Sequence, residues 1–312
     1  MLLLCLALGA LCVPAVAGAA LYLTLDGAFG FLGQPLPEPS TAGAPEWPES
    51  SRINVLLLGT DQREGEAGPP RTDTIIVATL DPQARSAGIL SLPRDLWVPI
   101  PGYGHERINA AFELGEGARA GGGPDLARKT VEQLLGVPIH HYVLVGFGGF
   151  EKFVDLVGGA LVDVERPIKD DDYPDHGYGL RRIYFQPGLQ RLDGEAALWY
   201  VRTRHADSDF GRARRQQQLL LALRNQVIQP DLLPKAPSIA AALAGAVKTD
   251  MRPSDLLPLL QVARAIDPST MVNRVVDESM TTHWVTPAGA QVEVPDQAAL
   301  RRVVQEVFGQ AS

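Results

Sequence analysis

Residues 53–61 read INVLLLGTD, and the segment Ile53–Leu58 is apolar at all but one position. The segment Thr74–Leu80 has the same character, as do Gly88–Leu92 and Ile139–Val145. Short runs that are apolar on both alternating faces are typical of strands buried at the centre of a sheet. These four segments therefore predict the middle of a β-sheet.

Helical patterns lie between and after these strands. The clearest, Pro124–Leu135, has proline at its first position and Gly136 just beyond its end, which is the usual asymmetry of a helix. The other helical patterns cover Phe150–Val157, Gly194–Val201, Arg212–Val227 and Asp296–Phe308. Strands that alternate with helices predict an α/β sandwich. The Ala-rich segment Pro234–Val247 contains Lys235 and is short for a membrane span, so we expect a buried helix there.

The N-terminal segment Leu2–Leu25 contains no charged residue. As a helix, at about 1.5 Å per residue, it would span roughly 36 Å, which exceeds the ~30 Å core of a bilayer. We expect residues 1–26 to be a transmembrane anchor. The competing interpretation is a cleaved signal peptide, because Ala15-Val16-Ala17 offers a cleavage site, but a basic segment does not precede it.

Residues 27–51 contain five prolines among Gly, Ser and Glu, and this composition favours an extended spacer over a packed core. Residues 52–312 form the predicted folded domain. The net charge of the chain is −8, and the acids are spread out, which argues against a nucleic-acid partner. Both cysteines, Cys5 and Cys12, lie in the apolar segment, so the folded domain has no thiol for a disulfide, a zinc site or a nucleophile.

Polar residues follow the ends of the predicted strands. Asp61 follows the first strand, Asp73 precedes the second, and the motif SLPRD places Arg94 and Asp95 after the third. Loops at strand ends are where α/β proteins assemble their binding sites. Asp61 and Asp73 could therefore bring two carboxylates to one Mg²⁺ ion.

Arginine outnumbers lysine 23 to 5, and eight arginines fall between residues 181 and 215. The planar guanidinium suits phosphate oxygens, although codon bias and a solvated helix face would explain the same count. Arg212 and Gln216 are four residues apart, so in a helix they share a face near its N-terminus, where the dipole favours an anion. Arg202 and Arg204 would need an extended backbone to point the same way.

Two other clusters favour structural roles. His140 and His141 are adjacent in a predicted strand, so their rings face opposite ways and cannot hold one metal ion. The acidic segment Asp170–Asp172, with Asp175 and His176 after it, lacks the spacing of a calcium loop, so we expect a solvated loop.

Several motifs occur together in one order: GTDQR, RTDTI, LSLPRD, RINAAF, the region Val145–Gly159 with GGFEKFVDLVGG, and YVRTR followed by DFGRARRQQ. In content and spacing they resemble the LytR-CpsA-Psr family of cell-envelope proteins. The resemblance implies an α/β/α sandwich with a central mixed sheet, preceded by one transmembrane helix, and makes residues 52–312 the catalytic domain.

The resemblance also assigns roles to individual residues. It makes Asp61 and Asp73 the acids associated with Mg²⁺, and it makes Arg94, Asp95 and Asp209 the catalytic candidates, with either Asp95 or Asp209 as the general base. The implied pyrophosphate-binding residues are Arg94, Arg107, Arg202, Arg204, Arg212 and Gln216. The family has an apolar slot for a lipid, and its candidate lining residues are Phe147, Phe150, Phe153, Val154 and Val157.

The implied activity is that of a Mg²⁺-dependent phosphotransferase, anchored in the cell membrane with its catalytic domain outside the cytoplasm. It would move an anionic or capsular glycopolymer, such as teichoic acid, from a polyprenyl pyrophosphate to a sugar hydroxyl of peptidoglycan. Two alternatives stay open from the sequence. One is a polyprenyl-pyrophosphate hydrolase, in which water replaces the sugar, and the other is a membrane-bound regulator that binds the lipid.

Overall fold

A computed structural model describes residues 52–60, 68–174, 179–203, 209–227, 247–252 and 270–309, together with residues 239, 259, 266 and 267. The predicted anchor (1–26), the predicted spacer (27–51) and nearly all of the predicted helix Pro234–Val247 lie outside these ranges. Among the helices that are described, none combines the length and the apolar character that crossing a membrane requires.

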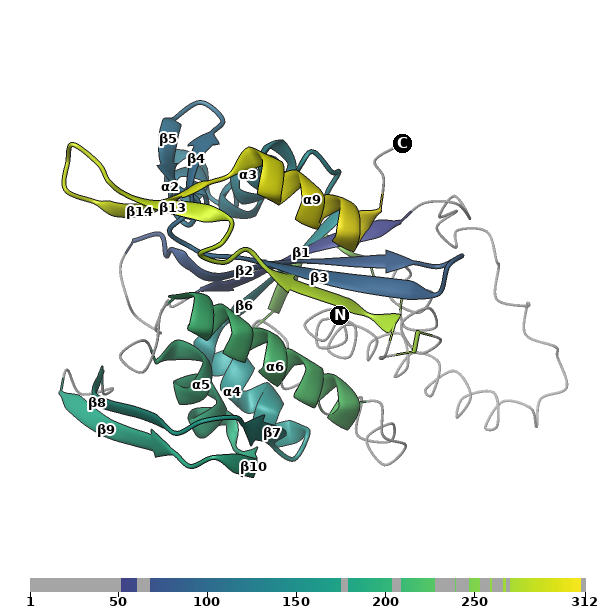
Figure 1. The fold of residues 1–312 in the computed structure, drawn as a ribbon, viewed down its shortest axis with the longest axis vertical. Coiled ribbons are helices and arrows are strands. Elements are labelled where there is room, and N and C mark those ends of the chain that lie inside the picture. The colour runs from purple at the N-terminus through teal and green to yellow at the C-terminus, as the bar shows by residue number, and fades with distance from the viewer. Residues whose placement is uncertain are drawn as a thin grey trace, which may run out of the picture.

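The centre of the fold is a six-stranded mixed sheet (Figure 1). Across the sheet the strands are β11 (Val247–Thr249), β6 (His141–Gly146), β1 (Ile53–Thr60), β2 (Thr72–Asp81), β3 (Ser86–Leu92) and β12 (Val272–Val275). β1, β2 and β3 form an antiparallel meander, whereas β6 runs parallel to β1 and β12 runs parallel to β3. The four segments that the sequence predicted as central strands thus lie side by side in the middle of this sheet.

The alternation of side chains along β1 divides the interior into two cores. Val55 and Leu57 point into one core, and Leu56 and Leu58 point into the other. All four side chains are fully buried. Because both faces of the strand are covered, the apolar run of β1 has no polar alternation, as the sequence pattern indicated.

Helices cover both faces of the sheet (Figure 1). One face carries α4 (Phe147–Leu156), α5 (Gly194–Arg202) and α6 (Asp209–Val227), and the other carries α2 (Ala110–Ala118), α3 (Gly123–Leu135) and α9 (Gln297–Phe308). α3 has proline in its first turn and ends at Gly136 with φ 69°, as predicted. The carboxylate of Asp296 begins α9 by accepting hydrogen bonds from the amides of Ala298 and Ala299.

Four two-stranded hairpins and ribbons, which the sequence patterns did not predict, surround this sandwich. They pair β4 (Trp97–Ile100) with β5 (Gly104–Arg107), β7 (Ala160–Val164) with β10 (Gly188–Leu192), β8 (Ile168–Pro174) with β9 (Leu180–Phe185), and β13 (Thr281–Val285) with β14 (Gln291–Pro295). β7 to β10 lie beside α4 and α5, and β13 and β14 lie near β4 and β5 (Figure 1). Their strands are short and lack the long continuous apolar runs that mark the central ones.

His140 and His141 contact different partners, in agreement with their structural interpretation. The Nδ1 atom of His140 accepts a hydrogen bond from the amide of Asn54 at 2.9 Å, while Nδ1 of His141 lies 3.4 Å from Oδ1 of Asp250. Burial lowers the pKa of His140 below 6.5, and the charge of His141 lowers it further. His140 thus links β1 to the start of β6, and His141 links β6 to Asp250, the residue after β11.

Candidate functional site

An apolar cavity of about 330 Å³ lies between the central sheet and the helices α4, α5 and α6. The sheet contributes residues from the ends of β1, β2 and β6, among them Gly59, Asp73 and Gly146, and β8 adds one further wall. Polar side chains occur among an otherwise apolar lining. They are Asp73, Thr74, Asp170, Tyr173, Arg202, Thr203, Arg212 and Gln216. A mainly apolar cavity with a few convergent polar groups is the usual form of a ligand-binding site.

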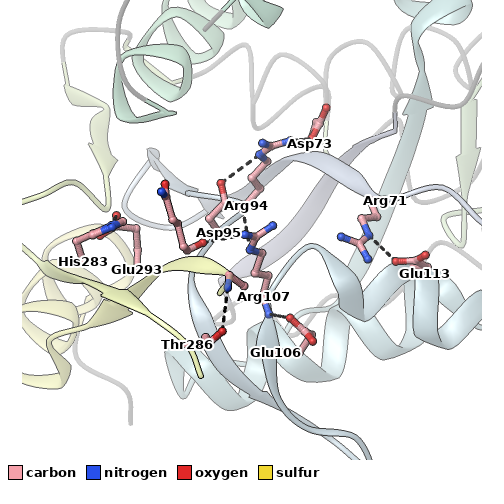
Figure 2. A network of polar contacts seen from close by, with 12 residues as sticks. Arg71, Asp73, Arg94, Asp95, Glu106, Arg107, Glu113, His283, Thr286 and Glu293 are labelled. Atoms are coloured by element: carbon pink, nitrogen blue, oxygen red, sulfur yellow. Dashed lines mark hydrogen bonds and ion pairs between the residues drawn. The ribbon is translucent and has the colours of Figure 1, made fainter. Parts of the chain in front are cut away.

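Arg94 and Asp95 occupy a turn directly after β3, and Arg94 contacts Asp73, which lines the cavity (Figure 2). Nη1 of Arg94 lies 2.6 Å from Oδ1 of Asp73, and its Nε lies 3.3 Å from Oδ2 of Asp95. Nε of Arg107, at the end of β5, lies 3.4 Å from Oδ1 of Asp95. The four half-buried residues therefore form one row of alternating charge, which we call the Arg94 row: Asp73, Arg94, Asp95 and Arg107.

The main chain of this turn is held from two sides. The carbonyl of Arg94 accepts a hydrogen bond from the amide of Asn109, and that of Asp95 accepts one from the amide of Glu293 in β14. Nη2 of Arg107 donates to the carbonyl of Gln291 at 2.9 Å, again in β14. Asn109 and the strand β14 thus fix the geometry of the Arg94 row, which is the pre-organisation that a binding site for charged groups needs.

Arg202 ends α5 and lies in the cavity wall between two aromatic rings. Its guanidinium carbon is 4.1 Å from the ring centre of Phe147 and 5.7 Å from that of Tyr173. Nη1 also donates to the hydroxyl of Tyr173 at 3.2 Å. Burial raises the pKa of Tyr173, while the nearby charge of Arg202 acts in the opposite direction. Stacking on flat rings leaves the edges of the guanidinium directed for hydrogen bonding.

Arg212 and Gln216 both line the cavity from α6, one turn apart, as the spacing of four predicted. The neighbouring arginines do not. Arg214 is exposed and lies 3.5 Å from Asp277, whereas Arg215 is buried and donates to the carbonyls of Tyr200 and Thr203. The arginine that faces the cavity is therefore Arg212, and Arg215 braces the end of α5.

The prediction of a solvated loop is wrong for Asp170. The segment Asp170–Asp172 was predicted to be a solvated loop, but it lies in β8, and the side chain of Asp170 is only 2% exposed. Its carboxylate accepts hydrogen bonds from the hydroxyl of Thr203 and the amide of Asp172, and it lines the cavity. Three consecutive acids resemble a solvated segment, yet the register of β8 turns Asp170 inward while Asp171 stays outside.

The candidate lipid-contacting residues divide into two groups. Phe147 and Phe150, on the first turns of α4, line the cavity. Phe153, Val154 and Val157 are not among its lining residues; they are buried in the core that α4 shares with the sheet. The later turns of α4 pack against other apolar side chains, so the apolar spacing there reflects core packing.

Three predicted site residues lie partly or wholly outside the described ranges. Asp61 and Arg204 fall in residues 61–67 and 204–208, and Asp209 is described only as the first residue of α6. Their roles stay predictions.

The described residues fit a Mg²⁺ ion that takes one carboxylate from the protein and its other ligands from phosphate and water. Asp73 places a carboxylate in the cavity wall, and Mg²⁺ at phosphate sites takes one or two carboxylates, with phosphate oxygens and water as its other ligands. Across the described ranges, no three His, Cys, Asp or Glu side chains come together as a site made by protein alone. The donor set therefore fits an ion shared with a bound phosphate group.

Residues of the site that sequence reasoning missed include Tyr173, Thr203 and the β14 main chain. Tyr173 and Asp170 lie on the strand β8, part of which, Asp170–Asp172, was predicted to be a solvated loop. The period-two spacing of Ile168 and Asp170 is the signal that could have found them. The contact between Arg107 and Gln291 joins residues 184 positions apart and has no local signal.

The fold and the site together define an α/β protein in which an apolar cavity is lined by Arg202 and Arg212 and adjoins the Arg94 row. The chain belongs to the LytR_cpsA_psr family, whose model matches residues 38–307. This membership confirms the resemblance on which the residue assignments rest.

Two similar proteins carry different names. The chain is 33% identical over 265 residues to a protein of Oceanobacillus iheyensis named polyisoprenyl-teichoic acid–peptidoglycan teichoic acid transferase TagU, covering 84% of this chain and 77% of that protein. It is 36% identical over 208 residues to the regulatory protein MsrR of Staphylococcus aureus strain COL, covering 66% of this chain and 58% of that protein.

Solved structures agree with the mixed α/β fold and its central mixed sheet. The crystal structure of TagV from B. subtilis has a TM-score of 0.67 at 31% identity, covering 84% of this chain and 99% of that one. TagT bound to LIIa-WTA has a TM-score of 0.63 at 29% identity, covering 83% and 91%.

Proposed function

We propose that this protein transfers a glycopolymer from a polyprenyl-pyrophosphate donor to a sugar hydroxyl of peptidoglycan. The single observation that carries the proposal is the Arg94 row, which lies beside an apolar cavity that also contains Arg202 and Arg212. A polyprenyl pyrophosphate joins an apolar chain to two anionic phosphates. The cavity and the arginines match these two parts. The relatives named as teichoic acid transferases support the same activity.

The donor would bind with its lipid in the cavity, against Phe147 and Phe150, and with its pyrophosphate among the arginines. Arg94, Arg202 and Arg212 supply fixed guanidinium groups, and Gln216 adds an amide on the same face of α6. Guanidinium groups that are already oriented stabilise the charge that moves onto the leaving phosphate without a further cost of reorganisation.

The transfer step replaces one P–O bond by another. The hydroxyl oxygen of the acceptor, by resemblance the C6 hydroxyl of N-acetylmuramic acid, attacks the phosphorus that bears the glycopolymer. The bond from that phosphorus to the polyprenyl phosphate breaks, and the hydroxyl proton passes to a carboxylate. Asp95 is the candidate base in the Arg94 row, and Asp209 is the alternative. The products are a glycopolymer–peptidoglycan phosphodiester and polyprenyl phosphate.

Asp73, with Asp61, is the proposed holder of Mg²⁺. When bound, the ion would neutralise charge on the pyrophosphate oxygens. Asp73 also orients Arg94 through the 2.6 Å ion pair, so it serves the arginine site directly.

We also propose that residues 1–26 anchor the chain in the membrane and that residues 27–51 tether the catalytic domain outside the cytoplasm. This arrangement would keep the enzyme in the membrane that carries its lipid donor. At ~3.1 Å per residue, an extended tether of 25 residues would reach roughly 75 Å.

The proposal is tested with the full-length chain in detergent, a polyprenyl-pyrophosphate glycan, uncrosslinked peptidoglycan and Mg²⁺. We expect glycan to become attached to peptidoglycan and Arg94→Ala to lower kcat/KM by about a thousandfold, since that change removes a preformed cation from the transition state. Arg71→Ala is the matched control, because Arg71 is exposed and pairs with Glu113 outside the Arg94 row (Figure 2).

Release of glycan phosphate into solution without attachment would make the enzyme a hydrolase. Equal activity of the Arg94→Ala and Arg71→Ala variants would show that the Arg94 row is structural. Removal of Mg²⁺ with a chelator should abolish transfer, and unchanged transfer would contradict the metal assignment.

A further inference from the structure

Three aromatic side chains from two hairpins form one cluster on the surface, beyond the Arg94 row. The rings of Trp97 in β4 and Trp284 in β13 meet edge to face, with centres 5.9 Å apart and planes at 69°. The ring of His105 in β5 stacks on Trp97, with centres 6.5 Å apart and planes at 29°. Trp284 is 40% exposed, and because it touches the ring of Trp97 it forms part of a contiguous apolar patch rather than a single exposed side chain. We call this cluster the aromatic face.

Strand register places two members of the aromatic face, Trp97 and His105, on the outer side of their hairpin. In the β4–β5 hairpin, Trp97 pairs with Arg107 and Pro99 pairs with His105. Paired residues of an antiparallel hairpin lie on the same side, so these four side chains share one side. Val98 and Ile100, on the opposite side, are fully buried in the core. Trp97 and His105 thus lie on the outer surface of a hairpin whose inner surface is anchored. Trp284, which pairs with the buried Val292 in the other hairpin, packs on Trp97 from outside.

The aromatic face is continuous with the Arg94 row. Arg107 is the cross-strand partner of Trp97 and lies 3.4 Å from Asp95. The hairpin that carries Trp284 is fixed to the same place, because the amide of Glu293 donates to the carbonyl of Asp95. In Figure 2, His283 and Glu293 of this hairpin lie beside Asp95 and Arg107, on the side away from Asp73.

The apolar cavity and the aromatic face therefore lie at opposite ends of the row. Asp73 lines the cavity, whereas Asp95 and Arg107 do not. In a phosphoryl transfer the attacking oxygen and the leaving oxygen are roughly in line on opposite sides of the phosphorus. If the lipid phosphate leaves toward the cavity, the attacking hydroxyl must approach from the end occupied by Asp95, Arg107 and the aromatic face.

We propose that the aromatic face binds the acceptor glycan, with a sugar ring packed on Trp284 and Trp97, and so delivers its hydroxyl to Asp95. This inference rests on the proposed function. The C–H face of a sugar ring is apolar and packs on indole rings, while its hydroxyls stay free for polar partners at the edge. The in-line requirement favours the acceptor over the polymer of the donor as the occupant. It also favours a glycan over a second copy of this chain.

The test measures binding of the full-length chain to uncrosslinked peptidoglycan glycan strands without donor, by co-sedimentation. We expect Trp284→Ala to weaken this binding about tenfold. Because Trp97 is less exposed and its removal could disturb the hairpin, Trp97→Phe serves as a second, milder variant. Tyr184→Ala is the matched control, since Tyr184 is an exposed aromatic residue, 55% accessible, on the separate strand β9.

In the transfer assay, Trp284→Ala should raise KM for peptidoglycan about tenfold and leave KM for the donor unchanged. A raised KM for the donor alone would overturn the inference in favour of the donor polymer. An altered oligomeric state of Trp284→Ala, without a change in glycan binding, would assign the face to a second copy. If Trp284→Ala and Tyr184→Ala behave alike in both assays, the aromatic face does not bind the glycan.

The two proposals can fail separately. Binding that depends on Trp284 in a protein without transfer activity would overturn the proposed function but leave the glycan-binding face in place. If Trp284→Ala transfers the glycopolymer with an unchanged KM for peptidoglycan, the glycan-binding face is overturned and the proposed function stands.

Discussion

Helices α6 and α9 pack on opposite faces of the same sheet, yet they bury different kinds of side chain (Figure 1). The buried residues of α9 are all apolar, from Ala299 to Phe308. α6 buries Arg212, Arg215 and Arg224 beside its leucines. Among the described residues, the buried charged side chains are these three arginines and Asp170, all on the α6 side of the sheet.

Stability alone does not explain this difference. Burying charge is expensive, and a well-packed apolar residue is often at least as stabilising in the same place. The α9 face shows how the sheet is covered when packing is the only requirement. The α6 face combines a cavity with buried cations, which is the arrangement expected where an anionic ligand replaces some of the lost water.

The largest expected effect on stability concerns a buried arginine that does not face the cavity. Arg215→Ala removes the donors to the carbonyls of Tyr200 and Thr203 and should lower the free energy of unfolding by about 3 kcal/mol. Arg214→Ala, one residue earlier and exposed, should change it by less than about 1 kcal/mol. Urea denaturation measures both. Equal effects of the two variants would mean that burial does not separate their roles.

An added methyl group between the sheet and α9 should destabilise the protein. A Cβ atom at Gly88 of β3 would lie 2.8 Å from both Cγ1 and the carbonyl oxygen of Val307 in α9. Gly88→Ala should therefore push α9 from the sheet and cost about 2 kcal/mol by thermal or urea unfolding. Gly148→Ala in α4 is the control, because a Cβ there meets nothing within 4 Å. If Gly88→Ala is as stable as Gly148→Ala, α9 is not closely packed here.

Arg212 tests the comparison most directly. Arg212→Met should lower the free energy of unfolding by about 1 kcal/mol, less than Arg215→Ala, because a side chain of similar length keeps the packing while the buried cation is removed. The same variant should bind the polyprenyl-pyrophosphate donor roughly a hundredfold more weakly. Arg302→Met, on the exposed surface of α9, should leave donor binding unchanged. A strongly destabilised Arg212→Met variant with normal donor binding would contradict a ligand-binding role.

The smallest expected effect is a pH dependence at the start of β6. Because burial lowers the pKa of His140, the folded state favours its neutral ring, which accepts the amide of Asn54. Stability from this contact is complete above pH 6.5 and is lost as the pH falls below that value, since the unfolded chain then binds a proton more readily. His140→Asn keeps an acceptor and should flatten the stability profile between pH 7 and pH 5. An unchanged slope would show that His140 does not titrate in this range.

The central layer could be predicted from the sequence because its strands are buried on both sides. β1, β2 and β3 contain long apolar runs, and α3 and α9 carry recognisable first and last turns. The predicted strands and helices differ from the observed ones by a few residues at their ends; α6, for example, begins at Asp209, three residues before the predicted Arg212.

The site could be predicted only where its geometry is local. Arg212 and Gln216 share a helix face, and this periodicity is written in their spacing. The inward side chain of Asp170 depends on the register of β8, and the fixation of Asp95 depends on β14, nearly two hundred positions later. Such contacts are set by the packing of separate elements and leave no local pattern in the sequence.

The hydrogen bond from the amide of Glu293 to the carbonyl of Asp95 joins a late part of the chain to an early one, and this order matters during synthesis. Arg94, Asp95 and Arg107 are synthesised early, but the β14 main chain that holds them comes 184 residues after Arg107. A nascent chain that already contains the arginines therefore still lacks the support of its site. Activity becomes available only when synthesis has passed β14, so premature termination before residue 291 would yield a chain with most of its core and an unsupported Arg94 row.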